Sequence, residues 1–265
     1  MGKYEGYMLC TDLDGTLTEP PADGSDNVYI SKENCEAIEE FKAGGGLFTF
    51  STGRRPFYIR EKIFPFVTPN IPMITVNGAS IYDHVNDKIL KSVFLSRSVL
   101  DVPLIAFENF GKSLEEVYII AETEEFCLQF SEEIFEDKFR KIIALHEDWY
   151  KFVFRGSDEE STLSFQKFLK ERYSHCCYLP RSWQTGQEVL ASTATKGERA
   201  LELKSMFPAV HTLICVGDHE NDIPMIEKAD KGYVVSNAIP EVLKVADFVT
   251  VANTEAAIAK IISEI

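Results

Sequence analysis

The chain has 265 residues, long enough for one large α/β domain or two smaller ones, and its 45% of apolar residues excludes global disorder. Forty-two acidic residues against 27 basic ones give a net charge of −15, which repels nucleic acids and anionic membranes, and we see no cluster of Lys and Arg to offset it. No apolar run approaches the roughly 18–20 residues that span a bilayer, and the N-terminus carries no pattern typical of a secretory signal.

The first part of the chain alternates short apolar runs with helical patterns. Residues 7–11 are predicted to form a strand, and Ser31 is a suitable N-cap for a helix that ends at the glycines of 44–46. The elements expected next are a strand over 47–50, a helix that starts near Pro56 and a strand over 71–76. This order, with polar residues after each strand, indicates a parallel sheet with crossover helices.

The same order of elements returns towards the C-terminus. Thr195 is a suitable N-cap for a helix over 196–207, and a strand is expected over 211–216. A helix that contains Met225 and Ile226 follows, and then strands over 232–235 and 248–251 and a last helix from about 255.

The middle of the chain breaks this rhythm. Its strand-like pieces fall at 117–120, 126–130, 151–154 and 176–179, and acidic helical stretches fall at 132–146 and 159–173. Mixed elements of this kind predict a small α+β domain inserted into the parallel one. We therefore assign residues 1–83 and 191–265 to a Rossmann-like α/β domain with a parallel sheet, and residues 84–190 to an inserted α+β domain.

Two carboxylates follow the first predicted strand. Asp12 and Asp14 stand at i and i+2 in a strand-to-loop turn, so they repel each other unless a cation neutralises them or one keeps its proton. Either arrangement suits catalysis, because a metal can bind one oxygen while another attacks, and a raised proton affinity suits a general acid or base. Taken alone, an ordinary Asp-rich turn would also explain the pair.

A second acidic group follows the strand predicted over 211–216. Asp218 comes at the end of that strand, and Asn221 and Asp222 lie in the next turn. Hard oxygen ligands of this kind suit Mg²⁺, which keeps several waters and accepts few protein carboxylates. The preference of a helix N-terminus for acidic residues explains one carboxylate but not this cluster.

The string DLDGTLT at residues 12–18 resembles the first motif of the haloacid dehalogenase (HAD) superfamily, a group of aspartate-nucleophile phosphatases, mutases and relatives. Three further motifs of that family appear in order, namely FSTGR at 50–54, TKG at 195–197 and VGDHEND at 216–222. The resemblance covers residues 7–82 and 191–265. It implies a HAD core with the inserted α+β domain as its cap.

The resemblance also implies a role for each motif residue. Asp12 would be the nucleophile, and Asp14 would transfer the proton. The phosphate-binding residues would be Thr52, Gly53, Lys196 and Asn221, with Ser51 as the fallback for Thr52. The cofactor would be Mg²⁺, held by Asp12, Asp218 and the backbone carbonyl of Asp14, with Asp222 in support. A lysine in a first helical turn opposes the helix dipole, so electrostatics alone gives Lys196 no reason to be there.

The string VNGA at residues 76–79 looks like the Cof-type branch of the family, whose members hydrolyse sugar phosphates and other small phosphorylated metabolites. Cap placement supports that branch. The segment between Asp14 and the first helix is too short for a cap, whereas the segment between Thr52 and Lys196 is longer than two βα units need. We therefore expect a magnesium-dependent phosphatase that forms an aspartyl-phosphate, with sugar phosphates as the leading substrates and the cap as the specificity domain.

Three alternatives stay open on the sequence. A phosphosugar mutase such as phosphomannomutase shares the fold and the first motif. The second alternative is dehalogenation of haloalkanoic acids, a reaction in which Asp14 has no clear role. The third is a non-catalytic metabolite-binding protein. Absence of the nucleophile or of a metal carboxylate would favour it, but the sequence contains both kinds of residue.

The remaining expectations concern partners and location. We expect a small phosphorylated metabolite as the partner, no nucleic acid, no membrane, and a monomer or weak dimer. The six cysteines contain no CxxC pair, so reduced thiols in a cytoplasmic protein are expected.

Overall fold

The computed structural model describes residues 2–19 and 27–265 and divides the chain into two compact units, each with its own hydrophobic core. The first unit contains Met1–Lys91 and Thr195–Ile265, and the second contains Ser92–Ala194. The sequence placed this division at 83 and 190 instead. The chain stays in the first unit up to residue 91 because strand β5 (Lys88–Ser92) pairs with β4 (Ser80–Asp83).

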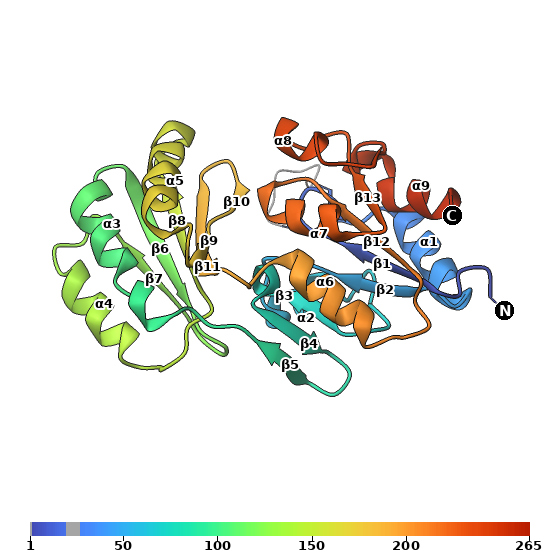
Figure 1. The fold of residues 1–265 in the computed structure, drawn as a ribbon, viewed down its shortest axis with the longest axis horizontal. Helices are drawn as coiled ribbons and strands as arrows, with labels where there is room; N and C mark the ends of the chain where they lie inside the picture. The colour runs from blue at the N-terminus through green and yellow to red at the C-terminus, as the bar shows by residue number, and fades with distance from the viewer. Residues whose placement is uncertain (1, 20–26) are drawn as a thin grey trace. The chain divides into compact units, whose positions relative to one another are not determined.

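A five-stranded sheet in the order β14-β13-β12-β1-β2 forms the centre of the first unit (Figure 1). All four pairings in it are parallel, as the alternation of strands and helices predicts. The strands are β1 (Tyr7–Thr11), β2 (Leu47–Phe50), β12 (Thr212–Gly217), β13 (Lys231–Val234) and β14 (Phe248–Val249). Four of the five residues of β1 are buried, which is typical of a central strand covered on both faces.

Helices flank this sheet in two contacting pairs, α1 with α9 and α6 with α7 (Figure 1). Ser31 caps α1 as predicted, since its Oγ accepts a hydrogen bond from the Asn34 N–H. The helices of the unit are α1 (Lys32–Ala43), α2 (Pro56–Lys62), α6 (Lys196–Ser205), α7 (Ile223–Lys228), α8 (Pro240–Leu243) and α9 (Ala257–Ser263).

A small three-stranded sheet, β3-β4-β5, belongs to the same unit. Strand β3 (Met73–Thr75) pairs antiparallel with β4, and an isolated parallel bridge from Ile74 to Ser51 joins it to the end of β2. The turn between β3 and β4 is a short 3₁₀ segment, Val76–Gly78. The sequence predicted the first of these strands but not β4 and β5.

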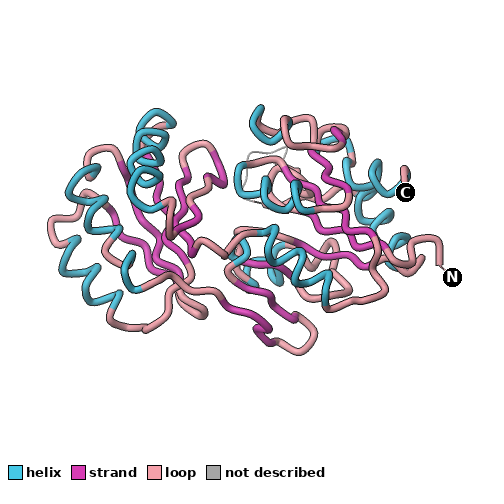
Figure 2. Tube along the Cα trace, in the orientation of Figure 1, coloured by secondary structure: helices cyan, strands magenta, loops and turns pink. Residues whose placement is uncertain are grey.

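The second unit is an antiparallel sheet with helices α3, α4 and α5 on one face, which confirms the predicted inserted α+β fold (Figure 2). Its strands are β6 (Leu114–Ile120), β7 (Glu125–Gln129), β8 (Lys151–Gly156), β9 (Cys177–Tyr178), β10 (Arg181–Trp183) and β11 (Gly186–Ala191). Its helices are α3 (Val102–Phe110), α4 (Phe135–Ile143) and α5 (Glu159–Tyr173). The sequence predicted α5 with these bounds and missed α3, β10 and β11.

In the second unit the aromatic side chains of alternate strand residues fill the space under the helices. Phe152 and Phe154 of β8 and Phe165 of α5 are fully buried, and the ring centroids of Phe154 and Phe165 lie 4.9 Å apart. This alternation is the period of two that a one-sided sheet requires.

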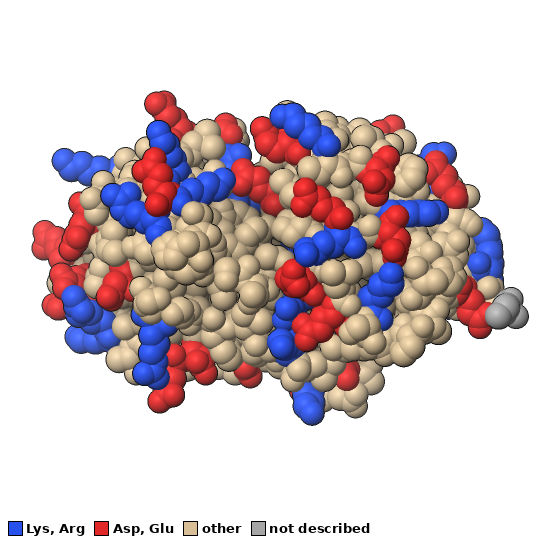
Figure 3. Space-filling model, viewed as in Figure 1, with Lys and Arg blue, Asp and Glu red and all other residues tan. Residues whose placement is uncertain are grey.

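Two features of the whole chain bear on function. Within residues 2–19 and 27–265, no helix is both long and apolar enough to cross a membrane. On the face shown in Figure 3, Lys and Arg side chains lie interspersed with Asp and Glu side chains.

Candidate active site

The predicted catalytic carboxylates meet at one edge of the parallel sheet because two neighbouring strands end there. Thr11 of β1 lies opposite Val216 of β12, and the Asp12 N–H donates to the Val216 carbonyl at 2.9 Å. The residues that follow Thr11 and Val216 in the two strands are therefore neighbours. Asp12, Asp218 and Asp222 each offer a carboxylate oxygen, and these oxygens all lie within 4.8 Å of one another.

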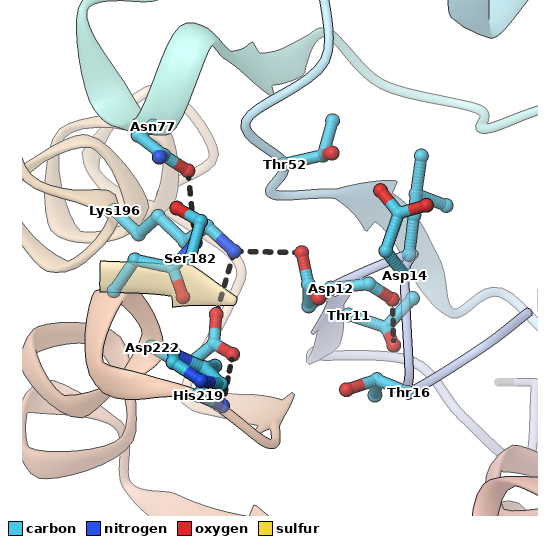
Figure 4. Close-up of polar contacts among 12 residues, drawn as sticks. Thr11, Asp12, Asp14, Thr16, Thr52, Asn77, Ser182, Lys196, His219 and Asp222 are labelled. Carbon is cyan, nitrogen blue, oxygen red and sulfur yellow. Dashed lines mark hydrogen bonds and ion pairs between the residues drawn. The ribbon is translucent and has the colours of Figure 1, made fainter. Parts of the chain in front are cut away.

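Lys196 is the cation of this cluster. Its side chain is fully buried at the start of α6, and its Nζ lies 2.6 Å from Asp12 Oδ1 and 2.6 Å from Asp222 Oδ1 (Figure 4). Burial by itself would lower the pKa of Lys196, but the two carboxylates raise it more, so the amine stays charged. These partners explain a lysine at a helix start, where the helix dipole disfavours it.

Both oxygens of Asp222 are engaged by the protein. Oδ1 accepts from Lys196, and Oδ2 accepts from the backbone N–H groups of Asp218 at 2.9 Å and His219 at 3.1 Å. The turn comes this close because residue 217 is glycine: a Cβ there would lie 2.4 Å from the Cβ of Asp222. The geometry favours a supporting role for Asp222, which orders the loop and Lys196.

Asp218 is held from the loop that follows β1. The Thr16 hydroxyl donates to Asp218 Oδ1 at 2.8 Å, a contact that the sequence analysis did not assign. Gly15 makes the loop fit, since its φ is +81° and a Cβ would lie 2.6 Å from Asp218 Oδ2. Burial and the nearby Asp222 carboxylate raise the pKa of Asp218 to about 7.

If all its carboxylates were ionised, the cluster would carry more negative charge than Lys196 can neutralise. Burial raises the pKa of Asp12 well above its ordinary value, and Asp222, Asp218 and Asp14 add to that rise against the opposing effect of Lys196. Three carboxylates thus face a single ammonium group. A divalent cation would offset this excess, and hard carboxylate oxygens are the donor set that Mg²⁺ prefers. The residues present therefore fit a magnesium site.

The carboxylate of Asp14 points away from this cluster and pairs with Arg54. The Arg54 Nε and Nη2 donate to Asp14 Oδ2 and Oδ1 at 2.9 and 3.0 Å, and both side chains are about half exposed. The guanidinium of Arg54 also lies 4.3 Å from the ring centroid of Tyr58. The side chain of Asp14 therefore stays accessible to solvent, and a metal role for its backbone carbonyl stays a prediction.

Two hydroxyl groups lie where β2 ends. The Thr52 Oγ1 accepts from the Arg54 N–H at 3.1 Å, and within the described residues its own O–H has no acceptor. The Oγ of Ser51 is buried and has no partner in the same part of the chain. The assignment of phosphate binding to Thr52, with Ser51 as the fallback, stays a prediction.

Asn221 reaches the site with a partner that the sequence analysis did not identify. Its Nδ2 donates to Asn77 Oδ1 at 3.0 Å, while its own Oδ1 is buried and has no partner among residues 2–19 and 27–265. The available signal was the Asn-Gly pair after a predicted strand, which is typical of a turn with positive φ. It located the turn but not the contact with Asn221.

Comparisons with known proteins agree on one family. The family model of haloacid dehalogenase-like hydrolases matches residues 9–262. A curated relative, the 5-amino-6-(5-phospho-D-ribitylamino)uracil phosphatase YcsE of Bacillus subtilis, is 26% identical and covers 96% of this chain and 94% of its own length.

Two solved structures share the fold. A haloacid dehalogenase-like hydrolase from B. subtilis has a TM-score of 0.81 at 20% identity, covering 97% of this chain and 99% of its own. The sugar phosphatase BT4131 has a TM-score of 0.76 at 20% identity, and the match covers 97% of this chain and 98% of its own. These likenesses support the predicted architecture of a parallel core with an inserted cap.

Proposed function

The chain belongs to the haloacid dehalogenase-like hydrolases, and from this we propose that it is a magnesium-dependent phosphatase that hydrolyses a small phosphorylated metabolite through an aspartyl-phosphate on Asp12. The observation that carries the proposal is the buried ammonium of Lys196, which lies 2.6 Å from the predicted nucleophile within a cluster of three carboxylates. A lysine in this place offsets charge on both the attacking carboxylate and an incoming phosphoryl group.

The metal would be held by Asp12 and Asp218, with the backbone carbonyl of Asp14. When bound, Mg²⁺ would neutralise charge on the phosphoryl oxygens. The donor set supports this assignment, because without a cation the pKa values of Asp12 and Asp218 are both raised.

The chain's own side chains would divide the remaining work. Lys196 fixes one oxygen of Asp12, so the other oxygen is the one that attacks phosphorus. Asp14, half exposed beside Arg54, would protonate the leaving oxygen and later take a proton from the attacking water. Thr52 and the Gly53 backbone would orient the phosphoryl group, as the family motifs imply.

We further propose a sugar phosphate as the substrate class and the inserted unit as its selector. Relatives support a small phosphorylated metabolite, since YcsE is named for a phosphoribitylamino compound and BT4131 is titled a sugar phosphatase. We also propose a cytoplasmic location and a monomer or weak dimer. All six cysteines are free thiols, in keeping with a reducing compartment.

A screen of phosphorylated metabolites tests the proposal. Released inorganic phosphate should depend on Mg²⁺ and disappear with excess chelator. Product analysis by NMR separates the phosphatase from a mutase, which would return an isomerised phosphosugar instead of free phosphate. Undiminished hydrolysis in chelator would contradict the metal assignment.

A further inference from the structure

The turn between β3 and β4 holds an uncommon backbone conformation in a buried place. Val76, Asn77 and Gly78 have φ angles of 53°, 56° and 89°, so three consecutive residues lie in the left-handed region. A β-branched residue such as Val76 rarely adopts such angles, and the surrounding structure has to hold it there. Val76 and Asn77 are 1% and 0% exposed.

Hydrogen bonds and close packing from two other segments hold this turn. The backbone N–H groups of Asn77 and Val76 donate to the carbonyls of Thr52 and Arg54 at 2.9 and 3.2 Å. On its other side the turn contacts the start of α6, where a Cβ on Gly78 would lie 2.3 Å from the Thr195 carbonyl. The turn is therefore packed between the loop after β2 and the helix that carries Lys196.

The side chain of Asn77 contacts a third segment, the 3₁₀ turn Glu220–Asp222. The Asn221 Nδ2 donates to Asn77 Oδ1 at 3.0 Å, and the next residue, Asp222, pairs with Lys196. An amide group is planar, so fixing its nitrogen also fixes its oxygen on the opposite side. The Oδ1 of Asn221 is consequently an oriented acceptor, buried and without a partner in the described chain. Such an acceptor suits a cation or a bound water rather than a phosphate oxygen, which accepts hydrogen bonds itself.

We propose that Asn77 is a positioning residue that acts through Asn221, fixing its amide so that Oδ1 faces the bound divalent cation, directly or through a coordinated water. This inference rests on the proposed metal-dependent function. It differs from the phosphate-binding role that the family motifs imply for Asn221, because it uses the unpartnered acceptor Oδ1, while one of the two N–H groups of Nδ2 already donates to Asn77. The strained turn thus has a function, which is to bring an amide oxygen to the correct side of Asn221.

Titration calorimetry with Mg²⁺ alone, without phosphate, tests the inference. Asn77→Gly keeps the left-handed backbone and removes only the side chain, and we expect it to weaken Mg²⁺ binding about tenfold or more, as loss of an orienting partner does at metal sites. Asn77→Asp keeps both an acceptor oxygen and tolerance of positive φ, so its affinity should stay within about threefold of wild type. Far-UV circular dichroism and the urea midpoint check that each variant folds.

The decisive control is the Asn221→Ala background. If Asn77 acts through Asn221, Asn77→Gly should not weaken Mg²⁺ binding further in the double variant. At saturating Mg²⁺, Asn77→Gly should also keep the wild-type KM for p-nitrophenyl phosphate, whereas a phosphate-binding role would raise it. Wild-type Mg²⁺ affinity in Asn77→Gly, or an equal loss with and without Asn221, overturns the inference and leaves the proposed function standing. Absence of Mg²⁺ binding by the wild-type protein would instead remove both.

Discussion

Asp12 shows how a single residue can suit two tasks. Its carboxylate accepts from Lys196 through Oδ1 and belongs to a cluster of acidic oxygens that a cation would bridge. Its raised pKa means that, without a cation, the ionised form is costly in this place. The same position therefore favours both a metal ligand and a nucleophile that becomes fully ionised when charge is compensated.

For Asp12→Asn we expect loss of turnover by at least about a thousandfold, equivalent to about 4 kcal/mol of barrier. An amide is not a nucleophile of this kind and is a weaker metal ligand. The metal-free variant should unfold at a urea concentration close to that of wild type, because Asn has the size of Asp without the negative charge that burial disfavours, and Lys196 keeps Asp222 as a partner. Phosphate release within about tenfold of wild type would exclude Asp12 as the nucleophile.

Asp14 differs from Asp12 in being half exposed and paired with Arg54. If Asp14 transfers the proton, Asp14→Asn should lower the rate of sugar phosphate hydrolysis by about a hundredfold or more, the range typical of general acid catalysis. With p-nitrophenyl phosphate, whose leaving group needs little protonation, the rate of the first turnover should stay close to that of wild type. Rapid mixing should then show a burst of p-nitrophenol followed by slow turnover, since the attacking water has lost its base. Equal losses in the first turnover of both substrates would contradict the role.

The raised pKa of Asp218, about 7, predicts a pH-dependent metal site. Below that pH the metal-free protein holds protons that Mg²⁺ has to displace, so Mg²⁺ affinity should rise with pH and level off above about 7. An acid whose pKa is raised by folding stabilises the folded protein at low pH and loses that contribution as pH rises from its unfolded value of about 4 to 7. The metal-free protein should therefore become less stable across this range.

Thermal unfolding with Mg²⁺ and with chelator measures this effect. The rise in Tm caused by Mg²⁺ should be small at about pH 5.5 and larger at about pH 8. An equal rise at both values would show that the cluster is already ionised without metal. Asp218→Asn is the matched control, because it cannot titrate and should flatten the pH dependence.

At the scale of elements, the site depends on short turns at the ends of strands. The turn over Val76–Gly78 approaches its neighbours so closely at Gly78, and the loop after β1 does so at Gly15, that a Cβ at either position would clash. Strand β3 is only three residues long, yet its turn contacts the loop after β2, the start of α6 and Asn221. Element length is therefore a poor guide to its contribution to the site.

Gly78→Ala and Gly45→Ala form a matched pair that separates backbone strain from close packing. Their φ angles are 89° and 91°, so both substitutions carry the cost of a left-handed alanine, about 1–2 kcal/mol. A Cβ at Gly45 would come no closer than 3.3 Å to its nearest neighbour, Glu5 Cγ, whereas one at Gly78 would lie 2.3 Å from Thr195 backbone atoms. Urea unfolding should show a clearly larger loss for Gly78→Ala, together with reduced activity as α6 and Lys196 shift. Equal losses of stability in the two variants would mean that α6 moves away from the added Cβ at little cost in free energy.

At the scale of the whole molecule, each unit has its own core, so we expect separate unfolding transitions. Both tryptophans, Trp149 and Trp183, lie in the second unit, and Trp149 is fully buried there. Tryptophan emission therefore reports on that unit, and far-UV circular dichroism reports on both.

Magnesium distinguishes the two transitions, because its predicted ligands all belong to the first unit. In urea, Mg²⁺ should move a transition seen by circular dichroism to higher concentration and leave the tryptophan transition in place. Coincident transitions that move together with Mg²⁺ would show that the chain unfolds as one cooperative unit. Asp218→Asn, with its impaired metal site, is the control for an effect of Mg²⁺ elsewhere.

The sequence by itself determined the parallel sheet, the inserted α+β domain and the meeting of Asp12, Asp218 and Asp222 at one edge of the sheet. These are local properties joined by one rule: apolar runs form parallel strands, and the residues after Thr11 and Gly217 must then meet at the same sheet edge. The sequence pattern did not predict α3, β4, β5, β10 and β11. Their short or mixed patterns give little periodicity, and the four strands among them are fixed by pairing with other strands.

Only the tertiary structure decided which partner each polar side chain has. Asp14 pairs with Arg54 from the end of β2, Lys196 joins Asp12 to Asp222, and Asn77 contacts Asn221. The residues in each of these pairs lie 26 to 184 positions apart, so no local pattern links them. Local preferences place a side chain at the end of a strand, but its direction depends on which oppositely charged or hydrogen-bonding group the packed chain brings within about 3 Å.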